Sequence, residues 1–154
     1  MTNLCCDILR TLSGKTLASA ESCTGGMIGT ALTAIPGSSA VYVGGVISYT
    51  NQVKHDLLRV PMELLEQYGA VSAPVAESMA IGVRQALNAD VAISVTGLAG
   101  PGADTFGNPV GTVFIGYADE KNVLARHFLF FGDRDRVRRQ AAEAALLLIL
   151  EYQA

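Results

Sequence analysis

The stretch Thr16-Leu-Ala-Ser-Ala-Glu-Ser-Cys-Thr-Gly-Gly26 decides the fold. Its first five residues are short and apolar, as in a buried strand. Two glycines follow where the chain turns into a helix predicted from Met27 to about Thr33. A strand that turns directly into a helix is typical of α/β proteins, whose ligands bind beyond the carboxyl ends of parallel strands. The polar residues of this turn are therefore the first candidates for a functional site.

The other segments alternate between helical and strand patterns. Helices are predicted from Asn3 to about Leu12, from Thr50 or Asn51 through Lys54, from Pro61 to Gly69, from Ser72 to Asn88, and from Asp133 to about Tyr152. Strands are predicted for Val41–Tyr49, where a Gly44-Gly45 pair suggests a bulge, for Val91–Val95, and for a hairpin of Val110–Tyr117 with Val123–Phe131. The order predicts an α/β fold, a three-layer α/β/α sandwich with a mixed, mostly parallel five-stranded sheet whose fourth strand is antiparallel.

Composition narrows the classes of partner. A chain of 154 residues predicts one domain, 1–154, and 16% charged residues against 50% hydrophobic suggest a homodimer or higher homo-oligomer. A net charge of −3 argues against nucleic acid and anionic membranes as partners. The chain shows no signal peptide and no apolar stretch long enough to span a bilayer, and its three cysteines form no disulfide framework, so a cytoplasmic location is expected.

Polar and glycine-rich segments follow the carboxyl ends of the predicted parallel strands. They comprise residues 21–26, 49–54, 96–102, the start of the fourth strand at 108–112, and 131–134. In an open α/β sheet these segments meet at one edge. We therefore expect the functional site there.

Ser22 and Lys54 are a candidate nucleophile and base at this edge. A helix N-terminus and partial burial both lower the pKa of a lysine, so a neutral Lys54 could take the proton of the Ser22 hydroxyl. The alternatives are a serine that only caps a turn and a lysine that is only solvated. Tyr49 could hydrogen-bond either residue or merely pack.

Cys23 is a competing nucleophile, with His55 or His127 as its base. His127 lies in the middle of a predicted strand, and the alternative for His55 is a histidine that is only exposed to solvent. The histidines and acidic residues have no metal-ligand spacing, so no metal site is predicted.

Two glycine-containing segments and two arginines are candidates for substrate binding. The turn of Cys23, Thr24, Gly25 and Gly26 offers backbone N–H groups to an anion or oxyanion. The segment from Thr96 to Gly102, with Gly97 and Gly100, precedes no helix and fails the phosphate-loop fingerprints, so it is either a substrate-contacting loop or a long turn. Arg134 and Arg138 share one helical face and suit a phosphate, unless they belong to a charged helix start.

Seven motifs together resemble the CinA carboxy-terminal domain family over nearly the whole chain. They are Ala20-Glu-Ser-Cys-Thr-Gly-Gly26, Pro36-Gly-Ser-Ser39, Ser48-Tyr49 with Lys54, Gly69-Ala-Val-Ser72, Thr96-Gly-Leu-Ala-Gly-Pro101, Pro109-Val-Gly-Thr112 and Gly132-Asp-Arg-Asp135. Full-length members carry a further amino-terminal domain, so this chain resembles the stand-alone form.

The resemblance implies a nicotinamide-nucleotide amidohydrolase of pyridine-nucleotide salvage, which converts nicotinamide mononucleotide and water into nicotinate mononucleotide and ammonia. It implies Ser22 as nucleophile and Lys54 as base, with Tyr49 and Thr96 in supporting positions, no cofactor, and a homodimer. The family name also reflects an association with competence or damage response. The alternative function is therefore a non-catalytic nucleotide-binding or regulatory module.

Overall fold

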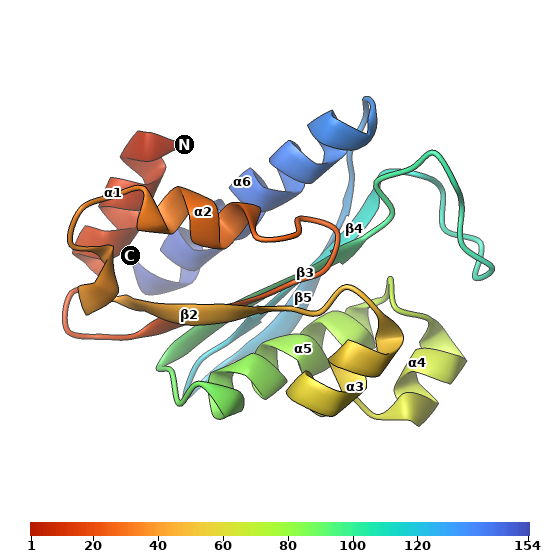
Figure 1. Ribbon diagram of the computed structural model, residues 1–154, viewed down its shortest axis with the longest axis horizontal. Coiled ribbons are helices and arrows are strands. Elements are labelled where there is room, and N and C mark those ends of the chain that lie inside the picture. The colour runs from red at the N-terminus through yellow and green to blue at the C-terminus, as the bar shows by residue number, and fades with distance from the viewer.

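The computed structural model describes residues 1–154 as helices on both faces of one sheet (Figure 1). The helices are α1 (Thr2–Thr11), α2 (Met27–Thr33), α3 (Asn51–Leu58), α4 (Met62–Tyr68), α5 (Ala73–Ala86) and α6 (Arg134–Gln153), with a short 3₁₀ helix η1 (Ser38–Ala40). The strands are β1 (Leu17–Glu21), β2 (Tyr42–Ile47), β3 (Val91–Gly97), β4 (Thr112–Ala118) and β5 (Val123–Leu129).

The sheet is mixed and has the order β2-β1-β3-β4-β5. β1 pairs in parallel with β2 and β3, whereas β4 is antiparallel to both β3 and β5. Glu21, the last residue of β1, lies opposite Ile47 and Val95. The carboxyl ends of three parallel strands therefore coincide, and the predicted fold class is confirmed.

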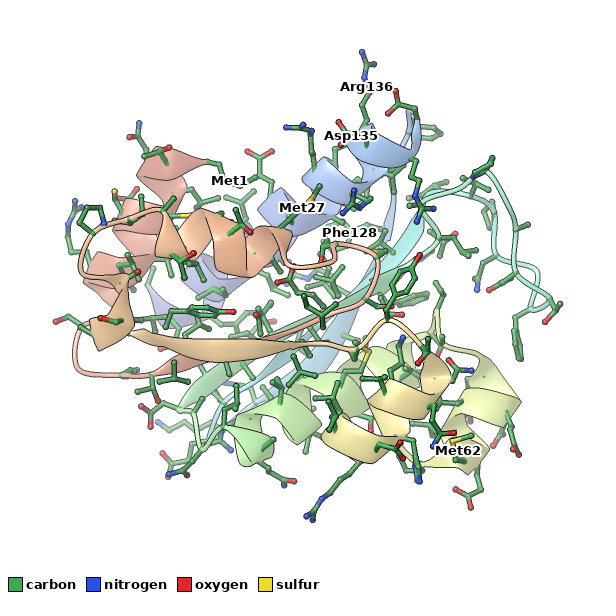
Figure 2. All side chains as sticks on the ribbon, viewed as in Figure 1. Met1, Met27, Met62, Phe128, Asp135 and Arg136 are labelled. Carbon is green, nitrogen blue, oxygen red and sulfur yellow. The ribbon has the colours of Figure 1, made fainter.

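Two hydrophobic clusters fill the space on either side of the sheet. α1, α2 and α6 cover one face, and α3, α4 and α5 cover the other (Figure 1). Leu17 of β1 belongs to the cluster on the first face, while Ala18 and Ala20 belong to the second. Figure 2 shows the same separation in Met27 and Met62, which lie in opposite helical layers. Burial on both faces is the reason that β1 is apolar almost throughout.

Several predicted boundaries are corrected by the structure. β2 ends at Ile47 instead of Tyr49, and the hairpin is shorter at its open end. The register shifts where Tyr42 and Gly44 pair with consecutive residues of β1, so the bulge lies next to the predicted glycine pair. Ser72 occupies the N-cap position of α5, but its hydroxyl donates to the Gly69 carbonyl instead of accepting from the helix. The predicted side-chain cap is therefore absent, because a capping hydroxyl must accept a hydrogen bond from an N–H group in the first turn of the helix.

α6 is the longest helix and begins near the carboxyl edge of the sheet. The Asp133 carboxylate caps it by accepting from the Arg136 N–H. Figure 2 shows the Arg136 side chain directed away from the sheet at this end. One face of α6, with Val137, Ala141 and Leu148, is buried in the hydrophobic cluster on the first face of the sheet. Neither α6 nor any other helix combines the length and apolarity needed to cross a bilayer.

Candidate active site

A cavity of about 640 Å³ lies at the carboxyl edge of the sheet. Its walls come from the turn after β1, the segment after β2, the α4–α5 connection, the β3–β4 loop and the first residue of α6. The predicted segments 21–26, 49–54, 96–102 and 131–134 all contribute to it. The start of the fourth strand at 108–112 does not, and residues 104–106 of the same loop take its place.

Ser22 and Lys54 meet in this cavity. The Lys54 Nζ lies 2.9 Å from the Ser22 Oγ and 2.8 Å from the Ser48 carbonyl oxygen. Lys54 is 1% exposed and Ser22 is 7% exposed. The lysine therefore has two oxygen partners and almost no contact with bulk water.

Burial changes the ionisation of this lysine. Desolvation by burial lowers the pKa of Lys54 from 10.5 to about 8, and the charge of Cys23 acts in the opposite direction. A charged ammonium loses its hydration in such a site, while a neutral amine loses much less. A usable fraction of neutral Lys54 is therefore present near neutral pH.

Local structure explains why the two residues meet. The Ser48 N–H donates to the Glu21 carbonyl, which extends the parallel pairing of β1 and β2 and places Ser48 beside the start of the serine turn, residues 22–26. The Thr50 hydroxyl then caps α3 by accepting from the Val53 N–H. This start turns the fourth residue of the helix, Lys54, back toward Ser22.

The serine turn has three backbone N–H groups without a protein acceptor, those of Cys23, Thr24 and Gly26. The Gly25 N–H is occupied by the Ser22 carbonyl at 3.1 Å. Gly25 and Gly26 have φ values of 57° and 107°, a left-handed region that glycine enters without strain. Free N–H groups of this kind have the chemistry of an oxyanion site. Cys23 lines the cavity of Ser22 and Lys54, whereas Thr24 and Gly26 line a neighbouring cavity.

Glu21 is a functional residue that the sequence analysis quoted but gave no role. Its carboxylate is buried and accepts from the Thr24 hydroxyl at 2.7 Å and from the N–H groups of Ile28 and Gly29 at 3.0 and 3.2 Å. It therefore satisfies the first N–H groups of α2 and fixes the turn. The signal was a single acidic residue at the end of an otherwise apolar strand, directly before a helix.

Cys23 has neither the lowered thiol pKa nor the neighbouring base that a cysteine nucleophile requires. Burial raises the pKa of Cys23 to about 11, so the thiolate is disfavoured at neutral pH. The Nδ1 of His55 contacts the Val60 carbonyl, and the His127 ring stacks on Phe114. Neither histidine is placed as a base for Cys23.

The other cavity residues make specific contacts of their own. Tyr49 is 61% exposed, and its hydroxyl accepts from Arg134 instead of contacting Ser22 or Lys54. The Thr96 hydroxyl donates to the Ala70 carbonyl at 2.7 Å. Gly97 has no room for a side chain, because a Cβ there would lie 2.7 Å from Val113 and 3.2 Å from the Cys23 sulfur.

The two candidate phosphate-binding arginines are separated. Arg134 lines the cavity, where it donates to the Gly100 carbonyl at 2.7 Å and to the Tyr49 hydroxyl at 3.2 Å. Arg138 lies one helical turn further on and lines a second cavity of about 410 Å³, together with Thr24, Gly25 and Gly26. The expectation that both arginines face one site is therefore wrong.

The β3–β4 loop adds cavity residues that the sequence analysis missed. The Asp104 carboxylate accepts from the N–H groups of Phe106 and Asn108 and from the Asn108 side chain. Asn108 also donates to the Val71 carbonyl, and Phe106 lies over Gly69. An aspartate that precedes such a turn was the available signal. No group of three or more His, Cys, Asp or Glu side chains in the chain could hold a metal ion.

A sequence model of the CinA C-terminal domain matches residues 2–153. The chain belongs to the CinA C-terminal domain family. Curated relatives of this domain carry the name CinA-like protein. One from Geobacter sp. (strain M21) is 49% identical over 140 residues, and one from Parasynechococcus marenigrum is 61% identical over 103 residues. These matches cover 91% and 67% of the chain but 34% and 25% of the relatives, so the CinA domain spans about a third of their length or less.

Solved structures of the CinA superfamily share the whole fold. The competence damage-inducible protein A of Klebsiella pneumoniae is 34% identical, with a TM-score of 0.95 over 97% of this chain and 94% of that chain. The competence/damage inducible protein CihA of Agrobacterium tumefaciens is 37% identical, with a TM-score of 0.95 over 99% and 95%. The mixed sheet and its helical layers are thus those of the CinA superfamily.

Proposed function

We propose that this CinA domain hydrolyses the carboxamide of nicotinamide mononucleotide to nicotinate mononucleotide and ammonia, with Ser22 as nucleophile and Lys54 as base. The observation that carries the proposal is the buried contact of 2.9 Å between the Lys54 Nζ and the Ser22 Oγ. The family resemblance supplies the substrate, and the site supplies the chemistry. A serine paired with a neutral lysine is a hydrolytic pair that needs no cofactor.

In the first half of the reaction, Lys54 activates the serine. Its neutral Nζ accepts the Ser22 proton as the Oγ forms a bond to the carboxamide carbon, and the Ser48 carbonyl holds the resulting ammonium. Negative charge develops on the carboxamide oxygen, where free N–H groups of the serine turn can stabilise it. Lys54 then donates its proton to the amide nitrogen, the carbon–nitrogen bond breaks, and ammonia leaves.

In the second half, water replaces ammonia. Lys54 is neutral again and accepts a proton from water as the water oxygen attacks the ester carbon. The ester bond to Ser22 then breaks, and the proton returns from Lys54 to the Ser22 oxygen. One lysine thus serves both halves, because its lowered pKa of about 8 allows both proton transfers near neutral pH.

Arg134 is the group in the cavity best suited to the 5′-phosphate. Its guanidinium lies at the start of α6, and its protein partners are the neutral oxygens of Gly100 and Tyr49. A phosphate would be a stronger acceptor than either of them. Gly97, at the end of β3, and Gly100, in the β3–β4 loop, line the same cavity as Arg134.

The test of the function is ammonia release from nicotinamide mononucleotide by the purified protein. We expect stoichiometric nicotinate mononucleotide and ammonia. Nucleotide binding without ammonia release would instead support the non-catalytic, regulatory function that was the alternative. Absence of both binding and release would contradict the proposed substrate class.

A further inference from the structure

Arg138 donates its hydrogen bonds to backbone carbonyls and not to a carboxylate. Its Nε donates to the Cys23 carbonyl at 2.9 Å, and one terminal nitrogen lies 3.4 Å from the Thr24 carbonyl. Arg126 and Arg139 each form an ion pair with a carboxylate, whereas Arg138 has no acidic partner. This half-buried cation is therefore directed at two backbone oxygens of the serine turn.

The contact between Arg138 and the Cys23 carbonyl also fixes the direction of the Thr24 N–H, because the two groups share one planar peptide unit. The Cys23 carbonyl and the Thr24 N–H belong to one trans peptide, so they point in opposite directions. When Arg138 holds the carbonyl oxygen on its own side of the turn, the Thr24 N–H must face away from Arg138. That N–H has no protein acceptor, and neither has the N–H of Cys23.

Thr24 is also held from a second direction. Its hydroxyl donates to the buried Glu21 carboxylate at 2.7 Å, and its carbonyl accepts from the Met27 N–H at 3.1 Å. Gly25 leaves the space that the guanidinium needs, because a Cβ there would lie 3.3 Å from the nearest Arg138 nitrogen. The Arg138 guanidinium thus holds the Thr24 carbonyl, and the Glu21 carboxylate holds the Thr24 hydroxyl.

We propose that Arg138 is a positioning residue, which presets the oxyanion site of the serine turn by holding the Cys23 and Thr24 carbonyls. The inference rests on the proposed serine chemistry and assigns Arg138 a role outside the phosphate seat. A donor that is already oriented before the reaction stabilises developing charge without a cost of reorganisation. Arg138 therefore acts on the chemical step and not on substrate binding.

The kinetic test compares Arg138→Met and Arg138→Lys with Arg139→Met, which removes the neighbouring cation that pairs with Asp135. Arg138→Met should lower kcat for nicotinamide mononucleotide by about 10- to 100-fold, with KM within about twofold. The loss is smaller than the roughly 100- to 1,000-fold cost of deleting an oxyanion donor, because the N–H groups remain and lose only their fixed direction. Arg138→Lys should fall between Met and wild type, because an ammonium can hold one carbonyl but not both. Arg139→Met should match wild type.

The same variants separate positioning from phosphate binding. If Arg138 only positions the turn, the preference for the mononucleotide over its riboside stays unchanged while kcat falls. A raised KM with intact kcat, or a lost preference for the mononucleotide, would overturn the proposal and make Arg138 a binding residue. Unchanged kcat in a variant with wild-type melting temperature would also overturn it.

A second readout is independent of the natural substrate. A fluorophosphonate reacts with an activated serine by forming an oxygen–phosphorus bond as the phosphorus–fluorine bond breaks, and its phosphoryl oxygen needs the same donors. Mass spectrometry should show labelling at Ser22 in wild type and about tenfold slower labelling in Arg138→Met. Labelling that depends on Arg138 without ammonia release would refute the substrate and retain the positioning role. Equal labelling of both proteins, or none in wild type, would refute the positioning role.

Discussion

Replacing Lys54 by methionine should remove part of the rise of stability with pH. Lys54 ionises with a pKa of 10.5 in the ordinary case and of about 8 in the fold. Below pH 8 the native state carries a buried ammonium, which costs about 3 kcal/mol relative to the unfolded chain. Between pH 8 and 10.5 the unfolded chain binds more protons than the native state, so the free energy of unfolding rises with pH. Methionine keeps an unbranched stem of similar length and removes the charge.

The expected size follows from the same two pKa values. Between pH 7 and pH 9.5 the stability of wild type should rise by about 2 kcal/mol relative to Lys54→Met. At pH 7 the variant should be about as stable as wild type or more so, although it loses two hydrogen bonds worth about 1 kcal/mol each. Urea unfolding at several pH values measures both quantities.

Lys121→Met is the matched control. Lys121 is exposed, and its side chain has no hydrogen-bond or ion-pair partner. Its removal should leave the pH dependence of stability unchanged. A constant stability difference between wild type and Lys54→Met across this pH range would refute the reasoning, because Lys54 would then have no depressed pKa and could not be a neutral base.

Three further predictions concern activity. The kcat/KM should rise with pH and level off above about pH 8, since Lys54 has a pKa of about 8 and only about a tenth of it is neutral at pH 7. Lys54→Arg should abolish turnover, because a guanidinium stays protonated in this range. An active Lys54→Arg enzyme with the wild-type pH profile would contradict Lys54 as base. The kcat/KM for nicotinamide mononucleotide should be more than about tenfold higher than that for nicotinamide riboside, which lacks the phosphate, because charge-assisted hydrogen bonds contribute roughly 1.5–3 kcal/mol each. Arg134→Ala should reduce this preference. Equal rates for both substrates in wild type would exclude a site that binds the phosphate. EDTA should leave activity unchanged, because the chain groups no metal-ligating side chains; a loss that a divalent metal restores would count against the serine–lysine mechanism.

Topology made the central pair predictable. The carboxyl ends of neighbouring parallel strands share one edge, so the loops that carry Ser22 and Lys54 had to be close once β1 and β2 were recognised. The helix cap at Thr50 was predictable from residue type, and so was the glycine turn that follows Ser22. These features depend on backbone geometry, which short local patterns encode well.

Side-chain directions at this edge were less predictable. Arg134 and Arg138 are four residues apart, about one helical turn and 6 Å along the axis, and that distance places them on different cavities. The hydroxyl of Tyr49 meets Arg134 because β2 ends two residues early. The β3–β4 loop has no periodicity, so nothing in its composition showed that residues 104–106, and not 108–112, would line the cavity.

The identity of the nucleophile is tested most directly by measuring ammonia release from nicotinamide mononucleotide with Ser22→Ala and Cys23→Ser side by side. Both side chains are small and adjacent, so each variant is a control for the effect of the other on the turn. Ser22→Ala should lose nearly all turnover while it still folds, since a hydroxyl in a turn contributes only about 1 kcal/mol to stability. Cys23→Ser should retain most of its activity, because burial holds the pKa of the Cys23 thiol at about 11. More than about a tenth of wild-type activity in Ser22→Ala, or its loss in a folded Cys23→Ser, would contradict Ser22 as the nucleophile.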